Sequence, residues 1–244
     1  MKKIFSFIVI SFVIGNIVSW SMGSWPIEFK QQPYSERQIT TIDALKKEMS
    51  NHAEDVSILI ELGAIYSMHN DIELANGYLD KAITLSPNNA LAIAWYNANR
   101  AKISGASLDF TWGLYKLYTL NTALSNISKA VTMAPDDITI RTIRLATFAN
   151  IGPINPEFNL VFEDETWFNT LFNNPTAQVP QQLKAQFYLS MAQAYYFNEN
   201  KQAAIDVTKY LNLFKSVPHK TKQDEKQFQQ LTTKFDQANR GKSW

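Results

Sequence analysis

Apolar and small residues recur at intervals of three and four between Val56 and Leu85, which is the spacing of one buried helix face. The pattern predicts a helix over about 55–68 and a second over about 72–85, joined at Asn70-Asp71. The second helix should end before Ser86-Pro87, because proline cannot continue a helix. The positions that carry the pattern, and that should pack the two helices together, are Leu59, Leu62, Gly63, Tyr66, Ala75, Leu79, Ala82 and Pro87.

Counted from Val56, these residues occupy positions 4, 7, 8, 11, 20, 24, 27 and 32 of a 34-residue unit. This spacing resembles the tetratricopeptide repeat (TPR), in which two antiparallel helices approach closely at small residues. The resemblance implies an all-α fold: a short right-handed α-solenoid of TPR-like helical hairpins. It also implies a scaffold whose function depends on what it binds.

A second unit is longer than the standard repeat. Its first helix is expected over Ala90–Ile103, and Ala123, Ile127, Ala130 and Pro135 match the second. The extra residues, 104–120, predict an extended second helix or an inserted helix after a loop at Ser104-Gly105, which makes this repeat irregular. A third unit is partial: counted from Ala185, the matching residues are Tyr188, Met191, Ala192, Tyr195 and Ala204, with Leu211 where a small residue is expected.

The segments around the repeats have weaker patterns. Residues 24–35 contain two prolines and predict an extended linker, and a helix is expected from Thr40 or Thr41 to Ser50. After Pro135, Asp136 and Asp137 should cap a further helix. Residues 150–182 are irregular, with a short helix over 163–172 that buries Trp167, Phe168, Leu171 and Phe172. The polar segment 221–239, with Phe228, Leu231 and Phe235 on one stripe, predicts a capping helix.

The N-terminus is typical of a secretory signal. Lys2 and Lys3 precede the apolar stretch Ile4–Val18, and small residues follow, so cleavage is expected after Ser21 or Gly23. The alternative is an uncleaved membrane anchor, which takes about 20 apolar residues. The predicted organisation is a signal peptide at 1–23, a linker and pre-repeat helix at 24–52, a TPR-like helical domain at 53–216, and a C-terminal capping helix and tail at 217–244.

Composition narrows the function further. The 244 residues contain no cysteine, so the folded chain has no disulfide and no thiol chemistry, which with export fits a bacterial periplasm. The formal net charge is +1, and this balance argues against nucleic acid as the main partner. A hydrophobic content of 45% is enough for a sizeable core.

Catalytic motifs are missing from the sequence. There is no nucleophile elbow, Ser-x-x-Lys pair or Gly-rich phosphate loop. The histidines His52, His69 and His219 lack metal-ligand spacing, so no metal site and no cofactor is expected. Glu163-Asp164-Glu165 is better explained by a helix dipole than by a carboxylate pair. We therefore expect a protein that is not an enzyme.

The resemblance places a binding groove on exposed positions of each first helix. In the first unit these are Ser57, Ile60, Ala64 and Ser67, and in the third Gln186, Leu189, Gln193 and Tyr196. Arg100 could present charge to a partner, and Trp112 and Tyr115 could line a ligand cavity. For Trp112 itself, core packing is the favoured interpretation, because pockets are few per protein.

The function expected from these observations is a non-catalytic adaptor or scaffold in the bacterial cell envelope. Its partner would be another protein or peptide, with membrane-bound envelope machinery and a second copy of the chain as further options. The alternative is a periplasmic small-molecule or lipid-binding component associated with a solute transporter.

Overall fold

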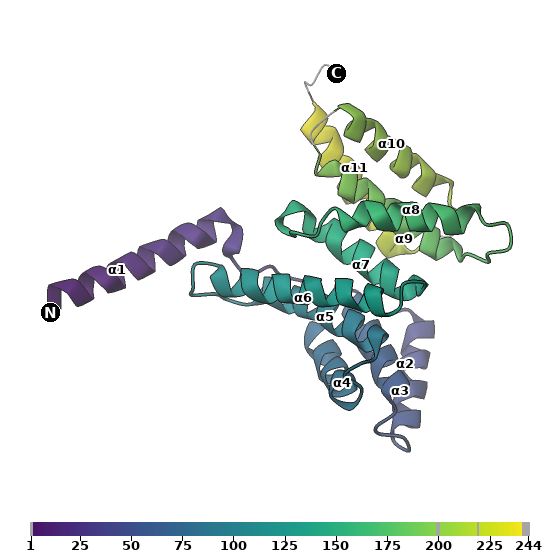
Figure 1. Ribbon diagram of the computed structural model, residues 1–244, viewed down its shortest axis with the longest axis horizontal. Helices are drawn as coiled ribbons and strands as arrows, with labels where there is room; N and C mark the ends of the chain where they lie inside the picture. The colour runs from purple at the N-terminus through teal and green to yellow at the C-terminus, as the bar shows by residue number, and fades with distance from the viewer. Residues whose placement is uncertain (1, 199–200, 219, 241–244) are drawn as a thin grey trace. The chain divides into compact units, whose positions relative to one another are not determined.

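Every regular element in the computed structural model is a helix, and the structure describes residues 2–198, 201–218 and 220–240. These residues form eleven α-helices, a π-helical turn and a 3-10 turn (Figure 1). Helices that follow one another pack in adjacent pairs, with α3 on α4, α5 on α6 and α9 on α10. The elements are α1 (Lys2–Ser19), η1 (Trp20–Ser24), α2 (Glu36–Met49), α3 (Val56–Met68), α4 (Ile72–Leu85), α5 (Ala90–Ala106), α6 (Leu114–Met133), α7 (Ile138–Ile151), η2 (Gly152–Ile154), α8 (Leu160–Asn173), α9 (Gln181–Tyr196), α10 (Lys201–Ser216) and α11 (Lys222–Asn239).

The chain divides into two compact units. Unit 1 is Met1–Ile140 and unit 2 is Arg141–Trp244. The division lies inside residues 53–216, which the repeat pattern predicts to be one helical domain.

The pair α3–α4 forms the centre of unit 1. Its bounds confirm the predicted helices, and Asp55 caps α3 by accepting hydrogen bonds from the amides of Ser57 and Ile58. All the repeat-packing residues are buried except Pro87, which is exposed after α4 has ended. Gly63 lies directly against Leu79, so the two helix axes approach closely at this point.

The pair α5–α6 shows which form the irregular second repeat takes. Of the two predicted forms, an extended second helix or an inserted helix, the structure has the first: residues 114–133 form one extended second helix, α6. The predicted loop at Ser104-Gly105 is wrong, because α5 continues through both residues to Ala106. Ser104 is tolerated in the helix since its hydroxyl donates to the Lys116 carbonyl at 2.8 Å and also contacts the Thr119 hydroxyl. The loop lies instead at 107–113.

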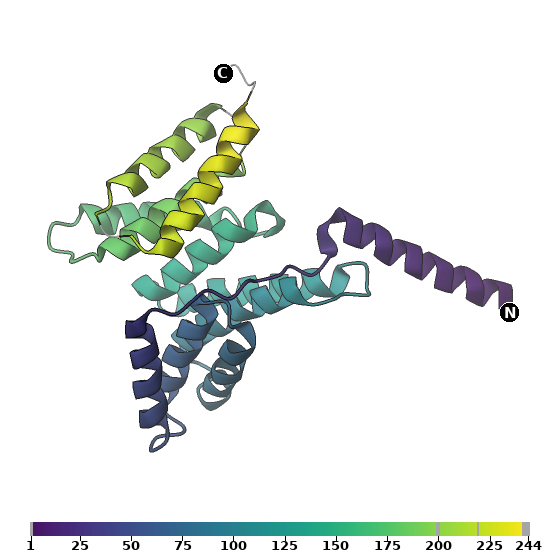
Figure 2. The ribbon, with the colours of Figure 1, turned by 180° about the vertical axis from the view of Figure 1, so that it is seen from behind.

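The linker is extended as predicted, and it lies along unit 1 (Figure 2). The amide of Ile27 donates to the Gly105 carbonyl at 2.9 Å, and the amide of Gln32 donates to the His69 carbonyl at 2.8 Å. The predicted start of the next helix at Thr40 is wrong. A capping box between Ser35 and Gln38 begins α2 one turn earlier, at Glu36.

Unit 2 has its own core. The aromatic side chains of Phe168, Phe187 and Tyr210 are buried in it, whereas Trp167, Leu171 and Phe172, which the sequence predicts to be buried, are only half-buried. Helix α8 begins at Leu160, three residues before the predicted start.

The C-terminal helix α11 confirms the predicted capping helix in its bounds. A capping box between Thr221 and Asp224 begins it. Leu231 is buried, and Phe228 stacks on Phe214 of α10 with ring centroids 5.0 Å apart. Most of the polar side chains of α11 are exposed, whereas Asp224 is buried.

The N-terminal helix is of a different kind. Most of its side chains between Ile4 and Val18 are exposed although they are apolar. Among the described helices, the stretch Ile4–Ser24 is long and apolar enough to cross a membrane. This is consistent with a signal sequence or an anchor.

Candidate functional site

The loop and first turns between α5 and α6 carry a dense group of exposed apolar side chains. Trp112 and Tyr115 of this segment are predicted ligand-binding residues, and both are exposed, by 51% and 58%. The favoured interpretation of Trp112 as a core residue is therefore wrong. We call the whole group the apolar turn surface: Leu108, Phe110, Trp112, Leu114, Tyr115, Leu117 and Tyr118.

The polar groups of this turn lie beneath that surface. The Asp109 side chain is buried and one of its oxygens accepts hydrogen bonds from the amide and the hydroxyl of Thr111, both at 2.6 Å. Its second oxygen accepts from the amide of Lys116 at 2.9 Å. The carboxylate thus organises the turn from inside.

Trp112 has an unusual backbone. Its φ is +59°, in the left-handed region that a bulky side chain rarely adopts. Strain of this kind persists where the surrounding structure imposes it, and it is concentrated at functional sites. The Trp112 ring contacts the ring of Phe12 in α1 with centroids 6.3 Å apart.

The predicted groove residues of the first unit do not form one exposed face. Ser57 is exposed, whereas Ile60 and Ser67 are buried. Ile60 packs in a cluster with Ala82 and with Ala92 of α5, so α5 covers this part of α3. Sequence spacing could not show this cover, because it comes from a neighbouring helix pair.

Lys102 of α5 contacts the end of α3 at Ser67. Its ammonium group donates to the Ser67 carbonyl at 2.6 Å and to the Asn70 side-chain oxygen at 2.9 Å. Burial lowers the pKa of Lys102 to about 8. This buried amine was not among the predicted site residues, since a lone lysine in a helix has no sequence signal.

None of the other predicted groove residues is fully exposed. Ala64 and Leu189 are buried, and the half-buried ones are Arg100, Gln186, Gln193 and Tyr196. Helix α5 and helix α9 therefore each present only part of the predicted surface to solvent.

The two described histidines differ in exposure. His52 is exposed, and His219 lies outside the described residues. His69 is buried beneath the linker, where its ring stacks on Tyr34 at 4.3 Å and its Nε2 contacts the side-chain amide of Gln38 at 2.8 Å. The described part of the chain has no group of three or more acidic, histidine or cysteine side chains that could hold a metal ion.

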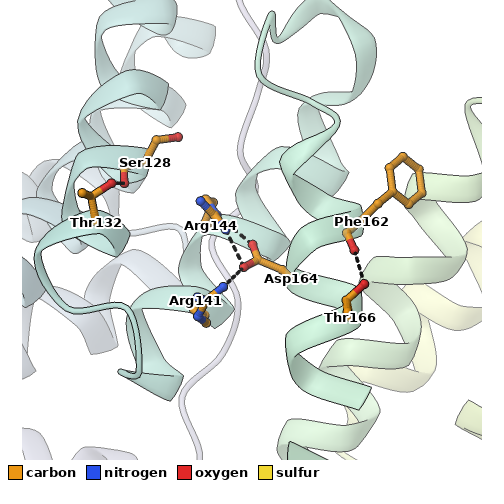
Figure 3. Close-up of polar contacts among 7 residues, drawn as sticks. All are labelled: Ser128, Thr132, Arg141, Arg144, Phe162, Asp164 and Thr166. Carbon is orange, nitrogen blue, oxygen red and sulfur yellow. Dashed lines mark hydrogen bonds and ion pairs between the residues drawn. The ribbon is translucent and has the colours of Figure 1, made fainter. Parts of the chain in front are cut away.

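The acidic group 163–165 is built into unit 2 more deeply than a helix-dipole role requires. The fully buried Asp164 accepts from Arg144 at 2.7 and 2.8 Å and from Arg141 at 2.8 Å (Figure 3). Arg141 also lies over the Trp167 ring, 4.7 Å from its centroid. The helix begins at Leu160, so these acids are in its first two turns, and Asp164 has specific cationic partners.

The neighbouring carboxylate, Glu165, has different partners. It accepts hydrogen bonds from the hydroxyls of Tyr195, at 2.9 Å, and of Tyr210. Burial, and then the hydrogen bond to Glu165, raises the pKa of both tyrosines, so both remain protonated donors. These contacts tie α8 to α9 and α10.

Unit 2 also has an open, mostly apolar pocket of about 400 Å³. It lies between the beginning of α10 and the end of α11. Its volume is within the range of small-ligand pockets. The lining residues are Lys201, Ala204, Ile205, Thr208, Phe235 and Asn239.

Comparisons with protein-family models, with curated proteins and with solved structures gave no match. What the structure itself establishes is an all-helical protein of stacked helices with an apolar N-terminal helix.

Proposed function

We propose that this chain is a non-catalytic interaction module of the TPR type in the bacterial cell envelope. Helices α3–α6 would form two hairpins of a right-handed solenoid, and the partner would be another protein or peptide. The apolar N-terminal helix would direct the chain to the envelope, as a signal sequence or as an anchor. No catalytic residue, metal or cofactor takes part in this proposal.

The close packing of α3 on α4 supports the repeat assignment. The positions that carry the repeat spacing, including Gly63, Ala75 and Ala82, are buried where the two helices meet. A generic helical hairpin does not require a residue without a side chain opposite Leu79. The packing thus follows the small-residue rule that the repeat spacing implies.

One observation supports the function itself: helices of unit 1 hold the chain's own extended linker. The linker lies along the ends of α3 and α5 through main-chain hydrogen bonds from Ile27 and Gln32. Asn70 adds a side-chain bond to the Lys30 carbonyl at 3.1 Å, and Gln31 one to Asp71 at 2.9 Å. Main-chain bonds combined with a few side-chain contacts are how extended peptides are recognised generally.

Site-specific crosslinking tests the proposal. The chain has no native cysteine, so single cysteines carrying a photo-crosslinker can be placed at Ser57 and Arg100 of unit 1. We expect both to capture the same envelope protein in living cells, whereas a probe at the exposed Asn88 does not. Equal capture from Asn88, or no capture at either position, would contradict the interaction module.

The alternative, a small-molecule or lipid-binding component associated with a solute transporter, is supported by the pocket between α10 and α11. Native mass spectrometry of the purified chain distinguishes the two. A bound apolar molecule that is lost in an Ile205→Asp variant, and retained in a Leu74→Asp variant, would favour the alternative.

A further inference from the structure

The turn between α5 and α6 is arranged with its polar groups inside and its apolar groups outside. Seven apolar side chains of the apolar turn surface are exposed within eleven residues, by 39–69%. Meanwhile the charged Asp109 is buried beneath them. A turn in water has the opposite arrangement, because exposed apolar area is unfavourable there.

Several main-chain amides of the turn are paired within it. The amides of Thr111 and Lys116 donate to Asp109, and the amide of Tyr115 donates to the Thr111 hydroxyl at 2.9 Å. The amides of Leu114 and Leu117 donate to carbonyls within the turn, at 3.0 and 2.9 Å. In hydrocarbon, irregular backbone is tolerated where its polar groups are paired with protein.

This turn packs against the apolar N-terminal helix and the η1 turn that follows it (Figure 1). A Cβ on Gly15 would lie 2.5 Å from Nε1 of Trp112, so only glycine lets the indole ring approach the helix. The indole N–H of Trp20 donates to the Asp109 carbonyl at 3.0 Å. The ring of Trp20 also contacts the Phe110 ring edge-on at 5.8 Å.

Asn16 connects the two segments. It is a polar residue within the apolar stretch, yet its side chain is 3% exposed. Its amide group donates to the Phe12 carbonyl at 2.8 Å, and its oxygen accepts from the amide of Trp112 at 3.4 Å. An unpaired polar side chain is costly inside a bilayer, and here the turn covers it.

We infer that the apolar turn surface inserts into a lipid bilayer beside α1, with α1 retained as a membrane anchor. The positive charges of Lys2 and Lys3 place the N-terminus on the cytoplasmic side, so the turn enters the leaflet that faces away from the cytoplasm. The occupant of the surface is lipid, and the inference goes beyond the interaction module because it requires no protein partner.

The lengths agree with this arrangement. Helix α1 ends at Ser19 and the chain kinks at Gly23, so the depth is counted from Ser19; Asn16 lies about 5 Å along the helix from it, at 1.5 Å per residue. Half of the hydrocarbon core is about 15 Å thick, so with the end of α1 at the membrane surface Trp112, which contacts Asn16, lies among acyl chains. Trp20 and Trp25, whose rings are 5.2 Å apart, then lie near the interface, where tryptophan is enriched.

Lys116 fits the same boundary. Its ammonium group extends towards the linker and donates to the Ser24 carbonyl at 2.9 Å and the Trp25 carbonyl at 3.4 Å. Lysines near a membrane boundary place their charge at the polar side in this way. A protein partner explains the surface less well, since the turn has already used the hydrogen-bond donors that such an interface would draw on.

Fluorescence of single-cysteine variants of the full chain tests the inference. Leu114→Cys and the control Leu74→Cys replace leucines that are 61% and 48% exposed in helices of unit 1. Each variant is labelled with an environment-sensitive nitrobenzoxadiazole probe and reconstituted in vesicles of phosphatidylethanolamine and phosphatidylglycerol. We expect the probe at 114 to be blue-shifted and quenched by nitroxide-labelled acyl chains, and the probe at 74 to show neither effect.

Two results would overturn the inference. A water-like spectrum at 114 means that the turn stays out of the membrane, and a blue shift without quenching by lipid means that protein, such as a second copy, covers it. If Leu114→Cys loses its helical circular dichroism, Tyr118→Cys, at 69% exposure, provides a second position with the same two outcomes. Because no partner is present, failure of the interaction module would leave this measurement unaffected.

The state of α1 is tested in cells by N-terminal sequencing. We expect the membrane-bound chain to keep the residues before Ser21. A mature form that begins after Ser21 or Gly23 would separate α1 from the turn and overturn the anchored arrangement.

Discussion

Gly63 of α3 lies directly against Leu79 of α4: a Cβ on Gly63 would enter the space of the Leu79 side chain, with Cδ2 at 2.7 Å. Both residues are buried, and Leu79 has no exposed surface. The leucine therefore fills the volume that the glycine leaves free. Their contact sets how closely the first helix pair packs.

Gly63→Ala should lower the free energy of unfolding by about 1–3 kcal/mol, because an extra methyl overpacks this contact. The control is Gly77→Ala in the same helix pair, where a Cβ would meet nothing within 4 Å. It should raise stability by up to about 1 kcal/mol, as glycine is a poor helix former. Urea denaturation followed by circular dichroism measures both.

A double variant sharpens this prediction. In Gly63→Ala/Leu79→Ala the new methyl group no longer meets a leucine. The double variant should therefore lose less unfolding free energy than the sum of the losses in the two single variants. Strict additivity would mean that the residues do not share this space.

The buried Arg144–Asp164 pair should be essential for unit 2. Asp164→Ala leaves guanidinium groups without their carboxylate, and breaking such a pair costs about 3–5 kcal/mol. Arg141→Ala should cost less, because its side chain is more exposed than that of Arg144, at 13% against 6%. Asp236→Ala, at an exposed site on α11, should stay within about 0.5 kcal/mol of the native chain.

These stabilities are measured by chemical denaturation with tryptophan fluorescence and circular dichroism recorded together. An Asp164→Ala variant as stable as Asp236→Ala would contradict the role given to the buried pair. Replacing both members, in Arg144→Met/Asp164→Leu, should recover part of the loss, since no charge of this pair is then left buried.

Lys102 should make unit 1 more stable as the pH rises above 8. Its pKa is about 8 in the folded chain, below its ordinary value, so between these two values the unfolded chain binds more protons. Below pH 8 the amine is protonated in both states, and the full cost of burying the charge is present. The gain on raising the pH through this window is on the order of 3 kcal/mol, at 1.36 kcal/mol per pKa unit.

The measurement compares the native chain with Lys102→Met between pH 7 and pH 10.5. The difference in unfolding free energy between the two should change with pH as described, because other titrating groups contribute equally to both. Lys129→Met, at an exposed position of α6, should keep the native pH profile. If the unfolding free energy of Lys102→Met instead follows the pH profile of the native chain in parallel, burial does not lower the pKa of the Lys102 amine.

At position 112, a glycine substitution is expected to destabilise the chain less than an alanine substitution. At its φ of +59° glycine has no steric penalty, so Trp112→Gly should be more stable than Trp112→Ala by about 1 kcal/mol. At Phe110, which has no positive φ, the order should be reversed. Thermal unfolding of the four variants in detergent micelles tests the prediction, and equal stabilities at position 112 would refute it.

Local helix signals were readable where the residues that decide the element lie close together. Asp55 and Ser86-Pro87 mark the ends of α3 and α4, because caps and prolines act within one helical turn. Ser104-Gly105 misled for the same reason: the residues favour a break, and the distant Lys116 carbonyl that holds Ser104 in the helix is invisible locally.

The sequence by itself determined the helical class, the pairing of α3 with α4 and the apolar character of α1, since all three follow from periodicity and from steric rules over short distances. Only the tertiary structure decided that α5 buries Ile60, that Asp164 lies between two arginines, and that Trp112 is exposed beside Asn16. Such relationships join residues far apart in the chain, and they depend on which helix faces meet. A linear pattern shows that a face is apolar, but the helix that covers it is determined by packing.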